Sequence, residues 1–230
     1  MRPVGILGGM GPEATILLMQ KVLNAVDARD DADHAPLIVH QNPQVPSRIK
    51  ALIEGTGADP APALGQMARD LEAAGANALA MPCNTAHHYA ETIRRATALP
   101  FLDMLALTAA TLKRAGARRV GMLASPATRM VGVFDAPFAA CGLEPVWARD
   151  EAMLLRLIRS IKAGEPTETL RPALTTCAGA LRGDGADHLL VGCTELSLMA
   201  DALDGPVTDT LDCLTAGIVD FATQRTPGAD

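Results

Sequence analysis

The sequence predicts an α/β protein in which mostly parallel sheets are flanked by helices, and two observations carry this prediction. Short apolar runs of strand length alternate with helical segments along the 230 residues, which is typical of parallel sheets covered on both faces. In addition, residues 75–85 and 185–195 look like copies of each other. Each copy has Gly-Ala-(Asn/Asp), an apolar run and a turn residue, and then a cysteine followed by polar residues.

A second pair of segments also indicates a duplicated half-chain. Val-Gly-Ile-Leu at residues 4–7 is similar to Val-Gly-Met-Leu at residues 120–123, and the offset within this pair is close to that within the first. A duplication would place Cys83 and Cys193 at matching positions. Their two thiols would then face each other across a pseudo-symmetric cleft.

Strands are expected where apolar runs are bounded by glycine, proline or small polar residues. These runs are residues 4–7, 37–40, 78–81, 101–102, 120–123, 144–146, 189–191 and 207–208. Helices are expected where apolar residues recur at helical spacing. They cover residues 13–26, 63–74, 86–96, 105–115, 151–163, 169–181 and 211–221, with further helices beginning near residues 48, 125 and 195. Residues 226–230 are expected to form a frayed tail.

Several chemically useful residues follow the predicted strands directly, and in parallel-sheet folds ligands bind beyond the carboxyl ends of the strands. Cys83, Cys193, Arg48 and the glycine-rich turn at residues 8–11 all lie at such ends. The turn lacks Gly-x-Gly-x-x-Gly and no Gly-Lys-Ser/Thr follows it, which argues against a nucleotide site. We expect its N–H groups to meet a substrate carboxylate, a role that also suits Arg48 in its proline-stiffened loop.

Composition narrows the classes of partner. The net charge is −6 and no run of Lys or Arg occurs, so neither nucleic acid nor an anionic membrane is expected as a partner. No apolar segment approaches the roughly 20 residues of a transmembrane helix. The N-terminus lacks the apolar core of a signal peptide, and the expected location is the cytoplasm.

The five cysteines do not form a recognisable disulfide or zinc pattern. Their number is odd, their spacing is wide, and neither C-x-x-C nor H-x-x-x-H occurs, so no metal site is expected. Cys141, Cys177 and Cys213 are interpreted as small apolar side chains of the core.

Cys83 and Cys193 differ from the other three because each lies where a strand ends and a helix is expected to begin. A helix N-terminus stabilises anions and would lower the pKa of each thiol, and the polar residues after each cysteine would cap the helix. A thiol with a pKa near ambient pH can both take and give a proton. Two such thiols on opposite sides of a substrate carbon would catalyse racemisation or epimerisation.

These features resemble the aspartate/glutamate racemase superfamily, whose members work without pyridoxal phosphate, and the resemblance covers nearly the whole chain. It rests on Gly-Ile-Leu-Gly-Gly-Met-Gly-Pro-Glu-Ala-Thr at residues 5–15, Asn-Pro-Gln-Val-Pro-Ser-Arg at 42–48, Pro-Cys-Asn-Thr-Ala-His at 82–87 and Gly-Cys-Thr-Glu-Leu at 192–196. The first stretch and Glu195 are similar to the aspartate racemase branch, since glutamate racemases usually have His in place of this Glu.

The resemblance implies roles for particular residues. Cys83 and Cys193 would be the two acid/base residues, with Cys83 deprotonating the D-enantiomer and Cys193 the L-enantiomer. Arg48 would bind a carboxylate, plausibly that of the substrate side chain, and Lys162 matches a family lysine near the second cysteine. The other residues expected to bind substrate are Met10, Asn84, Thr85, Thr194 and Glu195.

The same resemblance implies a fold and an activity. The fold would have two pseudo-symmetric domains with the active site in the cleft between them, and the last strand and helix would return to the first domain. The expected domains are residues 1–100 with 206–230, and residues 101–205. The expected activity is cofactor-independent interconversion of L- and D-aspartate, or glutamate, in a homodimer.

Other functions stay open at this point. The same fold and thiols would serve a broad-specificity amino-acid racemase, or an isomerase of the maleate isomerase or hydantoin racemase type. A thiol redox protein is disfavoured by the absence of C-x-x-C, and a non-catalytic amino-acid-binding protein would leave the paired cysteines without a purpose. A pyridoxal-phosphate enzyme is disfavoured because none of the four lysines has a phosphate-binding glycine-rich partner beside it.

One position departs from the resemblance. Aspartate racemases of this superfamily usually carry Asp before the arginine, and this chain has Ser47. The loss of that carboxylate changes the charge near Arg48, with three alternatives: Arg48 is freer to bind a substrate carboxylate, specificity shifts, or activity is weakened. The departure is therefore expected to affect substrate preference.

Overall fold

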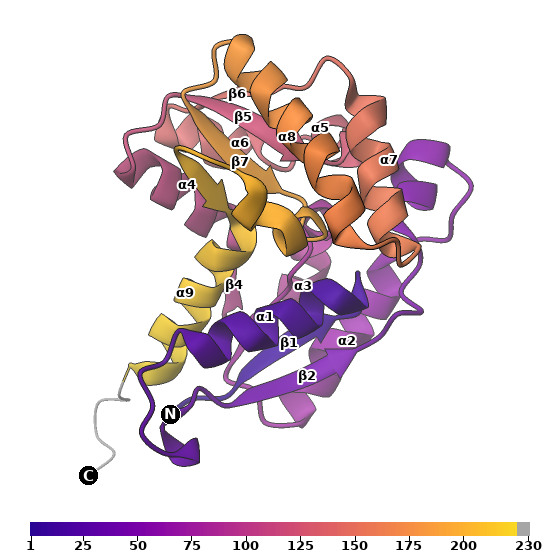
Figure 1. The fold of residues 1–230 in the computed structure, drawn as a ribbon. Helices are drawn as coiled ribbons and strands as arrows, with labels where there is room; N and C mark the ends of the chain where they lie inside the picture. The colour runs from indigo at the N-terminus through magenta and orange to yellow at the C-terminus, as the bar shows by residue number, and fades with distance from the viewer. Residues whose placement is uncertain (225–230) are drawn as a thin grey trace.

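Two lobes make up the protein, each built on a four-stranded parallel sheet (Figure 1). The computed structural model describes residues 1–224, so the tail expected at residues 226–230 lies outside the described part. The first sheet has the order β2-β1-β3-β4 and the second the order β6-β5-β7-β8. Its strands are β1 (Val4–Gly8), β2 (Leu37–Gln41), β3 (Ala78–Ala80) and β4 (Phe101–Leu102), and those of the second sheet are β5 (Arg119–Ala124), β6 (Glu144–Trp147), β7 (His188–Gly192) and β8 (Val207–Asp209).

The two sheets repeat one arrangement, because each strand of the first half has its counterpart at the same place in the second. Every pair of neighbouring strands is parallel. The central strands β1 and β7 are buried along their whole length, as expected for sheets covered by helices on both faces. The predicted fold class, with two pseudo-symmetric α/β units, is confirmed.

Helices cover both sheets. The α-helices are α1 (Pro12–Asn24), α2 (Ala61–Ala73), α3 (Ala90–Ala96), α4 (Met104–Arg114), α5 (Pro126–Met130), α6 (Asp135–Cys141), α7 (Glu151–Lys162), α8 (Thr167–Gly183) and α9 (Thr210–Thr223). Shorter helical segments are the 3₁₀ turns η1 (Asp31–Asp33), η3 (Thr85–Tyr89) and η4 (Leu196–Ala202), and the π-helical segment η2 (Lys50–Glu54). Helix α6 was not predicted from the sequence.

Helices α4 and α9 cross between the lobes. Each begins directly after the last strand of one sheet, and its apolar face is then buried against the other sheet. In α4, Leu105 and Leu112 pack in one cluster with Val120 of β5, and in α9, Leu211 and Ile218 pack with residues of β1. Figure 1 shows α9 running from the lobe of β7 to the lobe of β1. This exchange joins the two lobes.

The two edge strands β4 and β8 each belong to a different sheet from the one expected from the sequence. Strand β4, placed with the second domain from the sequence, pairs with β3 of the first sheet. Strand β8, expected to return to the first domain, pairs with β7 of the second sheet, and only the helix after it returns. The reason is that the chain passes from one lobe to the other after β4 and again after β8, so each of these strands stays in the sheet of the lobe that it leaves. The domain boundaries themselves stay a prediction.

The glycine-rich turn after β1 depends on close backbone contact. Gly9 has φ of 92°, and a Cβ at this position would lie 2.4 Å from the carbonyl carbon of Asn42. Only glycine fits both conditions. The Gly9 N–H donates to Thr15 Oγ1 at 2.9 Å, so this one N–H is not available to a substrate carboxylate. For the other N–H groups of the turn, contact with a carboxylate stays a prediction.

Asp209 caps α9 and gives the fold a pH dependence. Its Oδ1 accepts hydrogen bonds from Leu211 N and Ser197 Oγ, each at 2.8 Å, while Oδ2 is buried without a partner among residues 1–224. Burial raises the pKa of Asp209 to about 6, although these two hydrogen bonds oppose the shift. Because this pKa lies above the unfolded value of 3.8, the stabilisation is fully present below about pH 4 and is lost as pH rises through about 6.

Replacing Asp209 by Asn is expected to remove that loss. The free energy of unfolding of Asp209→Asn, relative to the wild type, should rise by about 3 kcal/mol between pH 4 and pH 7.5. Urea denaturation at the two pH values measures it. Asp212→Asn is the matched control, because Asp212 is exposed on the same helix and should change the difference by less than about 1 kcal/mol. Parallel pH profiles for Asp209→Asn and the wild type would contradict the assignment.

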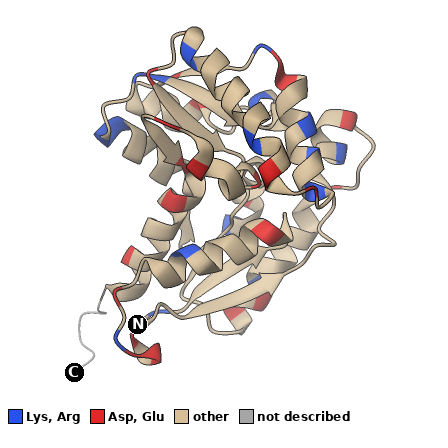
Figure 2. Ribbon diagram, in the orientation of Figure 1, with Lys and Arg blue, Asp and Glu red and all other residues tan. Residues whose placement is uncertain are grey.

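Charged residues of both signs are interspersed over the two lobes (Figure 2). Within residues 1–224, no helix has the length and apolar character needed to cross a membrane.

Candidate active site

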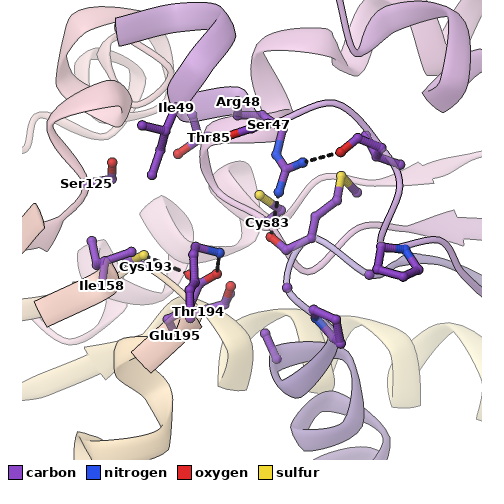
Figure 3. Close-up of a pocket in the computed structure, with 18 of the residues that line it drawn as sticks. Ser47, Arg48, Ile49, Cys83, Thr85, Ser125, Ile158, Cys193, Thr194 and Glu195 are labelled. Atoms are coloured by element: carbon purple, nitrogen blue, oxygen red, sulfur yellow. Dashed lines mark hydrogen bonds and ion pairs between the residues drawn. The ribbon is translucent and has the colours of Figure 1, made fainter. Parts of the chain in front are cut away.

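A cavity of about 650 Å³ lies between the lobes, and both halves of the chain line it (Figure 3). The segments at residues 9–14 and 43–50 form part of the wall from the first half, and α7 and the end of β7 contribute from the second. The nine residues singled out from the sequence all line this cavity: Met10, Arg48, Cys83, Asn84, Thr85, Lys162, Cys193, Thr194 and Glu195.

The two cysteines of the repeat reach the cavity from equivalent positions. Cys83 follows β3 and Cys193 follows β7, and each is 7% exposed. The other three cysteines do not line this cavity; Cys177 and Cys213 are buried in helices and Cys141 is half-buried at the end of α6. All five are free thiols. The cavity therefore presents one thiol from each half of the chain.

Cys193 belongs to a hydrogen-bonded group of three side chains. Its thiol donates to Glu195 Oε2 at 3.0 Å, and Glu195 Oε1 forms an ion pair with Lys162. Burial raises the pKa of Cys193 well above its ordinary value, the charge and hydrogen bond of Glu195 raise it further, and Lys162 opposes them. Cys193 is thus a protonated thiol at neutral pH.

Lys162 is held in its charged form. Burial lowers the pKa of Lys162, but the charge and hydrogen bond of Glu195 outweigh burial, and the resulting pKa lies above the ordinary value. The cavity therefore contains an ammonium–carboxylate pair beside the Cys193 thiol, with the carboxylate buried and the ammonium partly exposed.

The expectation that a helix N-terminus lowers the pKa of both thiols is wrong for Cys193. The chain after each cysteine forms a short 3₁₀ turn, η3 or η4, in place of an α-helix, so little helix dipole is present. The expected capping is also wrong, because the side chains of Asn84 and Glu195 make no cap hydrogen bond. Burial and Glu195 set the state of Cys193.

Three hydrogen bonds connect the cysteine turns to the opposite half of the chain. Thr194 Oγ1 donates to the carbonyl of Pro82 at 3.1 Å. The hydroxyls of Thr85 and Thr128 share a hydrogen bond of 3.1 Å. Asn84 Nδ2 donates to Thr210 Oγ1 at 3.0 Å, and Asn84 Oδ1 is buried without a partner among residues 1–224.

Main-chain carbonyls orient Arg48. Its Nη1 donates to Val45 O at 3.2 Å and Pro46 O at 2.9 Å, and its Nη2 donates to Met10 O at 3.2 Å. Three of the five N–H donors of a guanidinium are used in this way, and two remain. No carboxylate of residues 1–224 forms an ion pair with Arg48. The Oγ of the preceding residue, Ser47, accepts a hydrogen bond from Lys50 N at 3.3 Å.

The cavity also contains residues that sequence reasoning did not assign to a site. Ser125 follows β5, at the place equivalent to the glycine-rich turn after β1, so the same rule about strand ends could have found it. Ile49 and Ile158 line the cavity from opposite halves (Figure 3). No motif marks these two isoleucines, because their role follows from the approach of η2 to α7.

No group of three or more His, Cys, Asp or Glu side chains converges in the described part of the chain in a way that could hold a metal ion.

The fold and the site define a class of protein with two repeated α/β lobes and paired cysteines in the cavity between them. A sequence model of the Asp/Glu/hydantoin racemase family matches residues 7–218. The chain therefore belongs to this family and is a racemase, as its resemblance implied.

Known relatives are similar over almost the whole chain. The aspartate racemase of Picrophilus torridus is 29% identical, with 98% of this chain and 96% of that chain covered and a TM-score of 0.87. The broad-specificity amino-acid racemase RacX of Bacillus subtilis is 26% identical, with 94% and 96% covered. A glutamate racemase of Francisella tularensis is 15% identical, with 96% and 80% covered and a TM-score of 0.65, and shares the fold.

Proposed function

We propose that this protein interconverts the enantiomers of an amino acid by proton transfer between the substrate Cα and the thiols of Cys83 and Cys193. The observation that carries the proposal is the placement of one thiol from each half of the chain on one cavity between the lobes. Two acid/base groups on opposite sides of the carbon allow one to remove a proton from one face and the other to return a proton to the opposite face.

The protons balance over one turnover. In the direction that begins with the D-enantiomer, the Cys83 thiolate takes the proton from Cα and the electron pair of the C–H bond stays on carbon. The Cys193 thiol then gives its proton to the opposite face of the carbon. Cys83 ends as a thiol and Cys193 as a thiolate, which is the form that accepts the L-enantiomer.

The surroundings of Cys193 support its role as the acid in that direction. Its proton lies on the hydrogen bond to Glu195, and burial keeps the pKa of the thiol high. When Cys193 acts as the base, Glu195 is the group in contact with the sulfur, and the charge of Lys162 stabilises the thiolate. This trio distinguishes the Cys193 side of the reaction from the Cys83 side.

The cavity offers partners for the groups that all amino acids share. Asn84 Oδ1, a buried acceptor without a partner among residues 1–224, suits the α-ammonium group. Arg48 has two N–H donors left, which is the number that a carboxylate takes in a bidentate contact. Met10, Thr85 and Thr194 line the same cavity and are proposed to contact the substrate.

Aspartate or glutamate is the first candidate substrate. Two cations of the cavity, Arg48 and the exposed Lys50, have no carboxylate partner among residues 1–224, and a dicarboxylic amino acid has two carboxylates to pair with them. The similarity to an aspartate racemase at 29% identity supports this choice.

A broader range of amino acids is the second candidate, and the apolar side of the cavity favours it. Ile49 and Ile158 line the cavity together and would contact an uncharged side chain. Lys162 is held by Glu195 and is less available to a second carboxylate. Chiral chromatography of a panel of L- and D-amino acids incubated with the protein tests both candidates. No inversion of any amino acid would refute the proposed function.

Arg48→Met is expected to distinguish the two carboxylates. Loss of a charge-assisted bidentate contact should raise KM by about 10- to 100-fold. If Arg48 binds the side-chain carboxylate, KM should rise for aspartate and glutamate and not for neutral amino acids. If Arg48 binds the α-carboxylate, KM should rise by a similar factor for all of them. Arg95→Met, an exposed arginine on α3, is the matched control. Unchanged KM for every substrate would contradict a role of Arg48 in substrate binding.

A further inference from the structure

His87 lies four residues after Cys83 and connects the Cys83 turn to the start of α4. The ring is buried, with Nδ1 2.8 Å from the carbonyl oxygen of Cys83 and Nε2 3.3 Å from the backbone nitrogen of Met104. Only one neutral tautomer satisfies both contacts: Nδ1–H donates to Cys83 O, and Nε2 accepts from Met104 N–H. The ring also packs against Phe101, with centroids 5.4 Å apart.

Ser197 occupies the equivalent place in the second half, four residues after Cys193. It too is buried, and its Oγ donates to Asp209 Oδ1 at 2.8 Å. Asp209 is the N-cap of α9 and accepts from Leu211 N through the same oxygen. Both cysteine turns are therefore bonded to the first residues of a helix, although the side chains that make the bond differ.

The two helices reached in this way are the ones that cross between the lobes. The body of α4 packs on the second sheet and the body of α9 on the first, and the two helices contact each other. Each cysteine turn is thus attached to a helix whose position is set by the opposite lobe. The relative position of the two thiols depends on these attachments.

We propose that His87, and in the second half the Ser197–Asp209 pair, are positioning residues that attach the two cysteine turns to the crossing helices and so set the placement of the thiols about the substrate carbon. The inference rests on the proposed two-thiol racemisation. The inference goes beyond the proposed racemisation because it names the side chains that orient each thiol. A displacement of about 1 Å at a reacting group can reduce a rate about 100-fold, so loss of either attachment has a large effect on kcat.

Thiol alkylation tests the attachments without relying on catalysis. Each variant is treated with iodoacetamide over a range of pH, and the rates at Cys83 and Cys193 are quantified separately by peptide mass spectrometry. In His87→Ala the rate at Cys83 should change by about fivefold or more, with Cys193 within about twofold, and Ser197→Ala should give the reverse pattern. A change of equal size at both thiols in each variant indicates general loosening and overturns the proposal.

Racemisation supplies the second readout. His87→Ala should lower kcat by about 100-fold with a smaller change in KM. His87→Asn keeps a side-chain N–H near the position of Nδ1 but does not reach Met104 N, and His87→Gln places its amide near Nε2 but not near Cys83 O. Neither variant restores both bonds, so neither should recover more than a small part of this loss. His88→Ala is the matched control, because this neighbouring histidine is exposed.

The outcomes separate this inference from the proposed function. Full recovery of activity in His87→Asn, which keeps only the bond within the Cys83 turn, or losses that only follow the fall in Tm of each variant, would overturn the positioning role. Absence of racemisation in the wild type would refute the proposed function instead, and the alkylation pattern would still test the attachments of the two turns.

Discussion

Replacing Cys83 or Cys193 by serine is expected to abolish racemisation in both directions, with a loss of about 10³-fold or more. Serine has nearly the same volume, so the lobes and the cavity should be retained, but its hydroxyl does not ionise near neutral pH. Because the two enantiomers have equal free energy, kcat/KM must fall equally from either side.

The remaining thiol should still exchange the Cα proton of one enantiomer. Cys83→Ser leaves Cys193, which is expected to exchange the proton of the L-enantiomer with solvent without inverting it, and Cys193→Ser should act on the D-enantiomer. NMR in deuterated buffer, together with chiral chromatography, measures exchange and inversion separately. Cys141→Ser is the control, since this thiol does not line the cavity. Full racemisation by either single variant would contradict the two-thiol mechanism.

Glu195→Gln is expected to produce the second largest effect. The pKa of the Cys193 thiol is raised by burial and by Glu195 and lowered by Lys162. Removal of the carboxylate leaves Lys162 unpaired beside the thiol, so the pKa of Cys193 should fall. The variant also loses the group that holds the proton of Cys193, and kcat should decrease by about 100-fold or more.

The pH dependence of Cys193 alkylation measures this shift, and Glu13→Gln is a suitable control. Glu13 lines the same cavity but makes no ion pair with residues 1–224, and its replacement should leave the alkylation profile of Cys193 unchanged. A profile of Glu195→Gln that coincides with that of the wild type would show that Glu195 does not control the thiol.

Local sequence predicted much of the fold and the identity of the cavity residues. The copies at residues 75–85 and 185–195 are two buried strands that each end at a cysteine, and the rule about strand ends brought Arg48 and the turn after β1 to the same cavity. These features depend on periodicity and spacing, which a single sequence contains.

The sequence-based predictions that were wrong concern features that depend on contacts between residues far apart in the chain. Strand β8 (Val207–Asp209) joins the second sheet because it pairs with β7. The three residues of the strand do not indicate which of the two sheets it joins. The pKa of Cys193 depends on burial and on Lys162, which lies in another helix. The side chain of Asn84, expected to cap a helix, instead bonds Thr210 of the other half. The attachment made by His87 likewise needs the start of α4, which lies beyond α3 and β4.

The most direct test of the two-thiol mechanism is the fate of the Cα proton in the first turnovers of the wild type. The protein is incubated with each enantiomer of aspartate, glutamate and neutral amino acids in deuterated buffer without pyridoxal phosphate. Two bases predict that the newly formed enantiomer carries deuterium at Cα while the unreacted enantiomer keeps its proton. A product that retains the original proton, or an enantiomer that exchanges without inversion, would contradict proton transfer by Cys83 and Cys193 on opposite faces.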